Sequence, residues 1–103
     1  MNELYLCGTA LGTPEVKTTE NGLKVAELIL KVNKSFKNKD GNVDHDIVRV
    51  NLFKKLADES ENIVDGTQIL LKGHIYMSNF NKDGKVTYWS NIAADRLEYP
   101  SLM

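Results

Sequence analysis

The sequence predicts an all-β domain of five strands with one short helix between the third strand and the fourth. Three observations support this prediction. Apolar and polar residues alternate through most of the chain, which is the period of a half-buried strand. Turns that contain glycine separate the alternating segments, and one internal stretch departs from the alternation. The 103 residues, 42% of them hydrophobic, suffice for one compact core, so we expect a single domain over residues 1–103.

The first strand is expected over residues 3–11. Leu4 and Leu6 lie on one face of this strand, and Tyr5 and Cys7 lie on the other. Cys7 is the only cysteine, which excludes an internal disulfide and fits a reducing cytosol. Because its strand is apolar, we interpret Cys7 as a small buried hydrophobic residue.

The second and third strands each carry one aliphatic face. Residues 15–19 are extended, and the turn at Asn21-Gly22 leads into the second strand because this pair tolerates positive φ. A polar loop is expected over residues 34–42, and the third strand over residues 43–53. The inward positions of the two strands are Ala26, Leu28, Leu30, Val32, Val48, Val50 and Leu52.

Residues 54–63 depart from the alternation and fit one or two helical turns that end near Gly66. The aliphatic face of the fourth strand consists of Ile69, Leu71, Ile75 and Met77. After a turn over residues 81–84, the last strand is expected over residues 86–98. This order of elements is that of the OB-fold, a five-stranded Greek-key barrel that binds oligonucleotides. The pattern alone leaves other small barrels open.

Three strand-like segments carry a phenylalanine on the face that we assign to solvent: Phe36, Phe53 and Phe80. The outward face of the third strand also carries Ile47, Arg49 and Asn51. Every base has a π-face, so aromatic rings on a polar sheet surface bind single strands with little regard for sequence. The net charge is −1, yet residues 28–39 hold four lysines and no acid. We therefore expect single-stranded nucleic acid to bind this surface.

Other classes of function find little support in the sequence. No apolar run approaches the roughly 18 residues of a membrane span, and the first residues lack the features of a signal peptide. His45, His74 and Cys7 form no metal-ligand cluster. Residues 40–44 have the spacing of calcium ligands but lack the required glycine and the distal glutamate. We expect no enzyme activity, cofactor, metal or membrane contact, and a cytoplasmic, nucleoid-associated protein.

A set of short motifs extends over nearly the whole chain. The motifs are Met1–Leu11, Pro14-Glu15, Gly22, Val32–Asn38, Val50–Ala57, Gly66, Gly73, Asp83-Gly84 and Ala94-Asp95. In this order and spacing, the chain resembles the DNA-binding domain of bacterial single-stranded DNA-binding proteins. The resemblance implies that the chain binds and protects single-stranded DNA in replication, recombination or repair. It also implies a homotetramer in which first strands pair between subunits, with a dimer as the alternative.

The resemblance also assigns roles to residues. Phe36, Phe53 and Phe80 match the family's base-stacking aromatics. The cations that we expect to face phosphates are Lys34, Lys37, Arg49, Lys54 and Lys72. The family has a further aromatic where this chain has Ile47, which removes one stacking ring. Trp89 either replaces that ring or makes a contact at the rim or between subunits, and we favour the second reading.

A further departure concerns the end of the chain. The family usually continues into a flexible tail whose acidic, hydrophobic tip recruits replication and repair enzymes, whereas this sequence stops at Met103. We therefore do not expect recruitment through such a tail here, unless the sequence is part of a longer chain. Two alternative functions stay open. One is a primosome-type accessory protein that binds DNA as a dimer, and the other is an OB-fold module that binds proteins.

Overall fold

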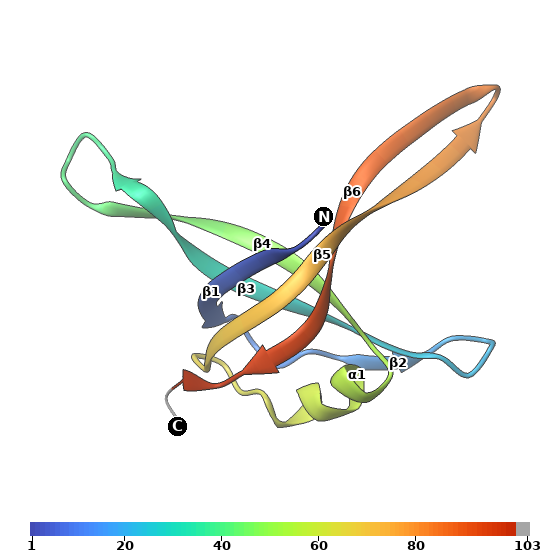
Figure 1. Cartoon of the computed structure of the whole chain (residues 1–103), viewed down its shortest axis with the longest axis horizontal. Helices are drawn as coiled ribbons and strands as arrows, with labels where there is room; N and C mark the ends of the chain where they lie inside the picture. The colour runs from blue at the N-terminus through green and yellow to red at the C-terminus, as the bar shows by residue number, and fades with distance from the viewer. Residues whose placement is uncertain (101–103) are drawn as a thin grey trace.

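A computed structural model describes residues 1–100, except for the side chains of residues 35–37. Strands dominate, and one short helix interrupts them, as predicted (Figure 1). The elements follow in the order β1 (Leu4–Ala10), β2 (Val16–Thr18), β3 (Lys24–Lys37), β4 (Val43–Phe53), α1 (Lys55–Glu59), η1 (Ser60–Asn62), β5 (Gln68–Lys82) and β6 (Lys85–Glu98).

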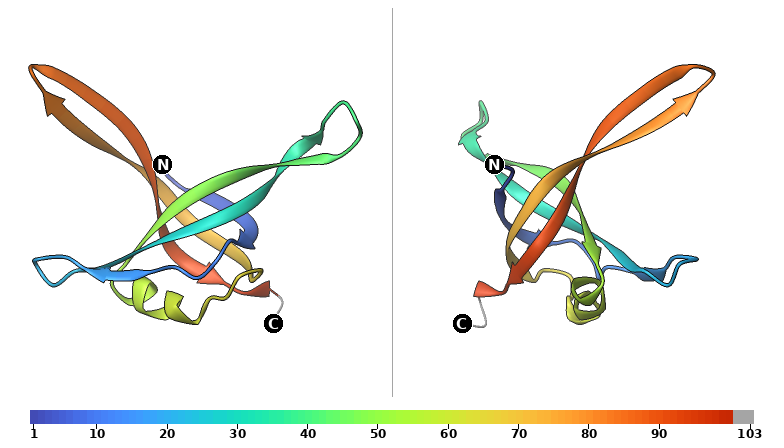
Figure 2. Two further views of the ribbon diagram at one scale, coloured as in Figure 1. Left: turned by 180° about the vertical axis from the view of Figure 1, so that it is seen from behind. Right: turned by 45° about the vertical axis from the view of Figure 1, so that its right-hand side comes forward.

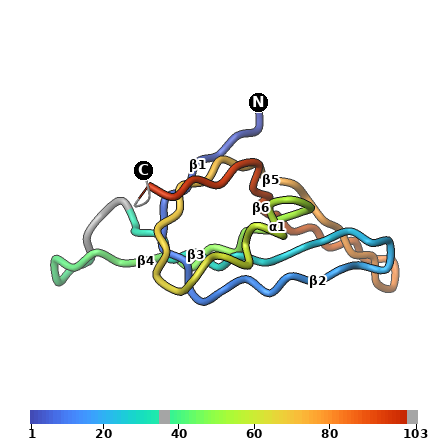
Figure 3. The backbone as a smooth tube through the Cα atoms, turned by 90° about the horizontal axis from the view of Figure 1, so that it is seen from below, coloured from blue at the N-terminus to red at the C-terminus, as the bar shows by residue number. Residues whose placement is uncertain are grey.

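Five strands close into a barrel. Neighbouring strands follow the order β1, β5, β6, β4 and β3, and β3 returns to β1 through the antiparallel pairs Thr9–Lys31 and Ala10–Leu30. The contact between β4 and β6 is parallel and consists of the pair Asn51–Ala93. The remaining strand, β2, pairs with the start of β3 (Figure 3). This closed arrangement confirms the predicted OB-fold.

The core of the barrel is the aliphatic set that the alternation predicts. The predicted positions that are fully or almost fully buried are Ala26, Leu28, Leu30, Val50, Leu52, Ile69 and Leu71. Val32 and Val48 are partly buried against them. The helical segment lies at the lower end of the barrel in Figure 1, where Ala57 and Ile63 join the core. Burial of this set stabilises the fold at about 25 cal/mol per Å² of apolar surface removed from water.

Two glycines allow strands to approach closely inside the barrel. A Cβ atom on Gly73 would overlap the backbone oxygen of Ala93, and one on Gly8 would lie 2.7 Å from the backbone oxygen of Lys31. Near Gly73 the β5–β6 register shifts, so that Asp95 has no partner on β5. The shift is a β-bulge, which bends the pair locally.

Two hairpins extend beyond the barrel as long twisted arms (Figures 1 and 2). The loop predicted over residues 34–42 is shorter than expected, because β3 continues to Lys37. Asn38 closes the remaining turn, and its side-chain oxygen accepts hydrogen bonds from the N–H groups of Asp40 and Asn42. The β5–β6 arm turns at Asp83 and Gly84, which both have positive φ. The turn expected over residues 81–84 is therefore shorter, because β5 continues to Lys82 and β6 begins at Lys85.

Apolar residues are exposed at two places where the sequence pattern is apolar. Ile75 and Met77 continue the aliphatic face of Ile69 and Leu71, but they are 45% and 60% exposed. They lie where β5 leaves the barrel, so no second layer covers them. Cys7 is exposed rather than buried, because it shares the outward face of β1 with Tyr5. Within residues 1–100, no helix is long and apolar enough to cross a membrane.

Candidate nucleic-acid interface

The outward face of the β3–β4 pair forms a stripe of side chains. In an antiparallel pair, residues directly opposite one another lie on the same face of the sheet. The stripe therefore consists of successive cross-strand pairs: Val25–Phe53, Glu27–Asn51, Ile29–Arg49 and Lys31–Ile47. Its β4 residues are those that the alternation predicts to face outward. The barrel wall thus aligns an aromatic ring, an amide, a guanidinium group and an aliphatic side chain.

A second set of side chains lies on one face of the β5–β6 arm. The cross-strand pairs of this face are Tyr76–Asn91, Ser78–Trp89 and Phe80–Thr87. The side-chain amide of Asn91 donates a 2.7 Å hydrogen bond to Ser78 Oγ. Phe80 and Trp89 are 55% and 44% exposed. The arm therefore presents two aromatic rings to solvent on the face that carries Tyr76.

Two grooves connect the stripe with the β5–β6 pair. The first, which we name the Phe53 groove, has a volume of about 560 Å³ and is lined by residues that include Thr13, Lys17, Glu27, Asn51, Phe53 and Tyr76. The second, the Trp89 groove, has a volume of about 470 Å³ and is lined by residues that include Glu27, Ile47, Arg49, Asn51, Trp89 and Asn91. Glu27 and Asn51 line both grooves. The two grooves therefore adjoin at this pair of residues, with Phe53 in one groove and Trp89 in the other.

Tyr76 joins the two sets of residues. The side-chain amide of Asn51 donates a 2.8 Å hydrogen bond to the Tyr76 hydroxyl. The rings of Tyr76 and Phe53 meet edge to face, with their centroids 6.5 Å apart. Tyr76 was not among the predicted site residues. It could have been found, because it shares the alternation of Phe80 on a strand face already assigned to solvent.

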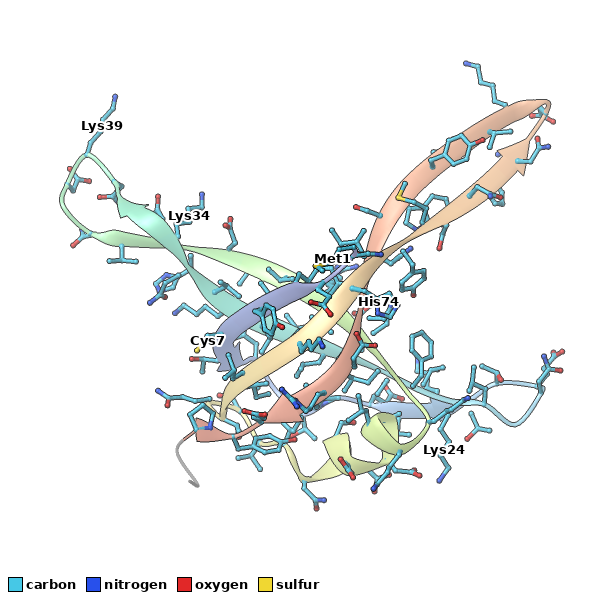
Figure 4. The ribbon with its side chains drawn as sticks, viewed as in Figure 1. Met1, Cys7, Lys24, Lys34, Lys39 and His74 are labelled. Carbon is cyan, nitrogen blue, oxygen red and sulfur yellow. The ribbon has the colours of Figure 1, made fainter. Side chains whose placement is uncertain are left out.

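His74 lies next to Tyr76, with the ring centroids 6.3 Å apart. The Nδ1 atom of His74 is 3.1 Å from both carboxylate oxygens of Asp95. Asp95 is the bulged residue of β6, so the bulge places a carboxylate where it can orient the imidazole. Figure 4 shows His74 where the β5–β6 arm leaves the barrel. The bulged residue Asp95 thus holds His74, and His74 in turn lies beside the Tyr76 ring.

The predicted cations lie in different places. Arg49 lines the Trp89 groove. Lys34 lies on the β3–β4 arm (Figure 4), and its Nζ is 3.7 Å from a carboxylate oxygen of Asp46. Lys72 forms a 3.3 Å ion pair with Glu3, and Lys54 lies beside the helical segment. Neither Lys54 nor Lys72 lines the Phe53 groove or the Trp89 groove.

The structure therefore brings together part of the predicted site. Phe53, Asn51, Arg49, Ile47 and Trp89 line the two connected grooves. Phe80 lies farther out, on the same face of the arm as Trp89. The side chains of Phe36 and Lys37 lie outside the described residues, so their predicted roles stay predictions.

Among the described side chains, two groups have clearly shifted pKa values, and both lie outside these grooves. A hydrogen bond to Asp58, together with the charge of that carboxylate, raises the pKa of Lys24. Partial burial, with a smaller effect of Glu59, raises the pKa of Tyr99. A cavity of about 760 Å³ that Tyr99 and Glu59 line contains none of the predicted site residues. Among the described residues, no group of three or more metal-binding side chains is present.

Comparisons with known proteins agree with this geometry. The model of the family described as "Single-strand binding protein family" matches residues 1–100. Single-stranded DNA-binding protein 2 of Staphylococcus aureus strain Mu50 is 31% identical over 101 residues, which are 96% of this chain and 72% of the relative. Single-stranded DNA-binding protein 1 of strain MSSA476 is 30% identical over the same share of this chain, which spans 65% of that relative's length.

Solved structures show the same fold. The wild-type single-stranded DNA binding protein from Thermus aquaticus superposes with a TM-score of 0.79 at 22% identity. The superposition covers 96% of this chain and 50% of the Thermus chain. A deletion mutant of the same protein gives a TM-score of 0.78. The barrel described above is thus found in structures of low sequence identity.

Proposed function

The chain belongs to the single-strand binding protein family, and from this premise we propose that it binds single-stranded DNA with little dependence on sequence. The family consists of binding proteins rather than enzymes, so binding involves no chemical step. The observation that carries the proposal is the pair of adjoining grooves, the Phe53 groove and the Trp89 groove, which share Glu27 and Asn51. The pair combines aromatic rings with an arginine on one side of the barrel.

In the proposed mechanism, unpaired bases stack on exposed rings. Phe53, Trp89 and Phe80 offer these rings along one path from the barrel onto the β5–β6 arm. Each base–aromatic stack contributes about 1–3 kcal/mol, measured by alanine substitution. Arg49 and Lys17 contact phosphates from the same grooves. Because such contacts release counterions, the affinity falls as the salt concentration rises.

We also propose that the protein is a homo-oligomer, a tetramer or a dimer. Two exposed surfaces support this part of the proposal. On β1, Tyr5 and Cys7 face solvent, and the residues before Thr9 pair only with β5 in the described chain. On the β5–β6 arm, the face opposite Trp89 exposes Ile75, Met77, Val86 and Tyr88. Apolar surface of this kind marks contacts with other proteins.

The process that the protein serves is also part of the proposal. We assign it to the cytoplasm, where it covers single strands that arise in replication, recombination or repair. Membership of the family is what supports this role. A primosome-type accessory protein would share the same grooves, and its dimeric mass and binding to a restart helicase would distinguish it.

Fluorescence anisotropy with labelled oligo-dT of about 35 nucleotides, long enough to fill several OB-fold sites, tests the proposal. The titration is done at low and moderate salt, with excess duplex as competitor. Tight binding that weakens with salt and persists in the presence of duplex is the expected result. An absence of binding at low salt would overturn the proposal and favour a module that binds proteins through the same aromatic rings.

A further inference from the structure

A carboxylate lies at the centre of the proposed DNA path. Glu27 lines both the Phe53 groove and the Trp89 groove, and its side chain is exposed. No ion pair of Glu27 is present within residues 1–34 and 38–100. The other carboxylate of the Phe53 groove, Glu15, does not line the Trp89 groove. Glu27 is therefore the acid that a bound strand would pass on its way between the grooves.

A negative charge at this position opposes the binding of a phosphate backbone, since like charges in one site disfavour each other. The same carboxylate is a strong hydrogen-bond acceptor with two oxygens. The cross-strand partner of Glu27, Asn51, uses its amide nitrogen to donate to Tyr76, which leaves the Asn51 oxygen as a second acceptor. Glu27 and Asn51 thus both offer hydrogen-bond acceptors, so a ligand that binds between them needs hydrogen-bond donors.

The four bases differ in the donors that they offer. In a single strand, the Watson–Crick edge of each base is free to be read. Guanine presents two adjacent N–H donors there, N1–H and the exocyclic N2 amino group, which match the two oxygens of a carboxylate. Adenine and cytosine each present one amino group, and thymine presents only N3–H. A carboxylate in the path therefore favours guanine and disfavours thymine.

The spacing of the sheet brings a stacked base within reach of Glu27. Phe53 is paired with Val25, and Glu27 is two residues farther along β3 on the same face. Such diagonal neighbours lie about 7–8 Å apart at Cα, so a base stacked on Phe53 extends its edge toward Glu27. Lys17 is paired with Val25 on the other side, and Arg49 lies in the next row beyond Asn51. Cations thus flank the acid along the stripe.

We propose that Glu27, together with the side-chain oxygen of Asn51, accepts hydrogen bonds from the Watson–Crick edge of a guanine stacked on Phe53. The protein then prefers strands that contain guanine to strands of thymine alone. This inference rests on the proposed function and refines it, because the site keeps its tolerance of sequence but gains a preference for one base.

The test compares three labelled oligonucleotides of about 35 nucleotides, each longer than one OB-fold site. They are oligo-dT, alternating dT-dG and alternating dT-deoxyinosine, in lithium buffer to prevent guanine quadruplexes. Deoxyinosine keeps the purine ring and N1–H but lacks the N2 amino group. The wild type is expected to bind dT-dG about three- to tenfold more tightly than dT-deoxyinosine, near the lower range for specific base contacts. If guanine increased the affinity only by stacking, the protein would bind dT-dG and dT-deoxyinosine equally tightly.

Two variants assign the preference to one side chain. Glu27→Gln removes the charge and one of the two acceptor oxygens, so the ratio of the two affinities should fall. Glu27→Ala removes both oxygens and should bring the ratio to about one. The affinity of Glu27→Gln for oligo-dT should rise, because a negative charge leaves the path. Glu61→Gln is the matched control. The substitution is chemically the same, and Glu61 lies on η1 and lines neither groove. This control should keep both the ratio and the affinity of the wild type.

Three outcomes separate the possibilities. Equal affinity of the wild type for dT-dG and dT-deoxyinosine overturns the inference and leaves the proposed function intact. A preference that persists in Glu27→Gln and in Glu27→Ala also overturns it, because another group then reads the base. An absence of binding to all three oligonucleotides at low salt refutes the proposed function itself. A thermal unfolding curve for each variant checks that the variant is folded at the temperature of the binding measurement.

Discussion

The ring of Tyr76 on β5 meets the ring of Phe53 on β4 edge to face, with the ring planes at 62°. The two strands are not neighbours in the barrel, because β6 lies between them. The contact therefore joins two strands that are not paired with each other. The hydrogen bond that Asn51 donates fixes the position of the Tyr76 hydroxyl. An edge-to-face pair is worth about 0.5–1.5 kcal/mol beyond its buried area. The contact with Tyr76 thus restricts the orientation of the Phe53 ring, and under the proposed function this lowers the entropy lost when a base stacks on it.

Phe53→Ala should weaken the binding of oligo-dT about five- to a hundredfold, the range for one lost base stack. The side chain lies on the outward face of β4 and is only partly buried, so the domain should remain folded. Anisotropy titrations give the affinity, and circular dichroism checks the fold. A folded variant that binds as tightly as the wild type would contradict the stacking role of Phe53.

Trp89 is the only tryptophan in the chain, so its fluorescence reports on one position. If a base stacks on Trp89 in its groove, oligo-dT should quench this fluorescence in proportion to occupancy. Trp89→Ala should weaken binding several-fold. Val64→Ala is the control, because Val64 is an exposed apolar residue that lines neither groove. Equal losses in the two variants would argue against a role specific to Trp89.

Tyr76→Phe removes the hydroxyl that accepts the hydrogen bond from Asn51 and keeps the aromatic ring. A typical hydrogen bond contributes about 0.5–1.5 kcal/mol, so oligo-dT affinity should fall about two- to tenfold. The loss arises because the Asn51 amide and the Phe53 ring are less well fixed. Tyr99→Phe, which removes a hydroxyl at a residue that lines neither groove, should bind as the wild type does. No change in Tyr76→Phe would mean that this contact does not organise the site.

Ile47→Trp should increase the affinity for oligo-dT by threefold or more, since a base stack contributes about 1–3 kcal/mol. Ile47 is exposed at the edge of the Trp89 groove, so a larger side chain meets no core atoms there. Val43→Trp, at an exposed position at the start of β4, controls for the added apolar surface. Unchanged affinity in Ile47→Trp would place position 47 outside the path of the strand.

The sequence was sufficient to predict the barrel, because its core positions alternate in step with the strands. Leu28, Leu30 and Val50 illustrate this, since local period and burial agree at each of them. The alternation continues in the β5–β6 arm, so Ile75 and Met77 share the aliphatic face of Leu71 although they are exposed. Alternation reports which residues share a face, and only the tertiary fold decides whether that face is covered.

The candidate site shows the same limit. Phe53 and Arg49 could be chosen because they are unusual residue types on a predicted outward face. Tyr76 and Glu27 matter because of their neighbours on other strands. Tyr76 contacts β4 residues although β6 lies between the two strands in the sheet order. Glu27 lines both grooves together with residues of β4. Barrel closure brings these strands together, and no local pattern encodes the resulting contacts. Lys54 and Lys72 are the converse case, since each is basic but lines neither groove.

Gly73→Ala should destabilise the fold by about 1–3 kcal/mol or more, the range for overpacking a closely packed site. The added Cβ would overlap the backbone oxygen of Ala93, and a backbone atom inside a paired sheet cannot turn away as a flexible side chain can. Urea unfolding measures the loss as a lower midpoint at an unchanged slope. Gly84→Asn is the control, because Gly84 has φ of 81° in an open turn, a conformation that asparagine tolerates. A Gly73→Ala midpoint equal to that of this control would show that β5 and β6 can separate at the bulge without loss of stability.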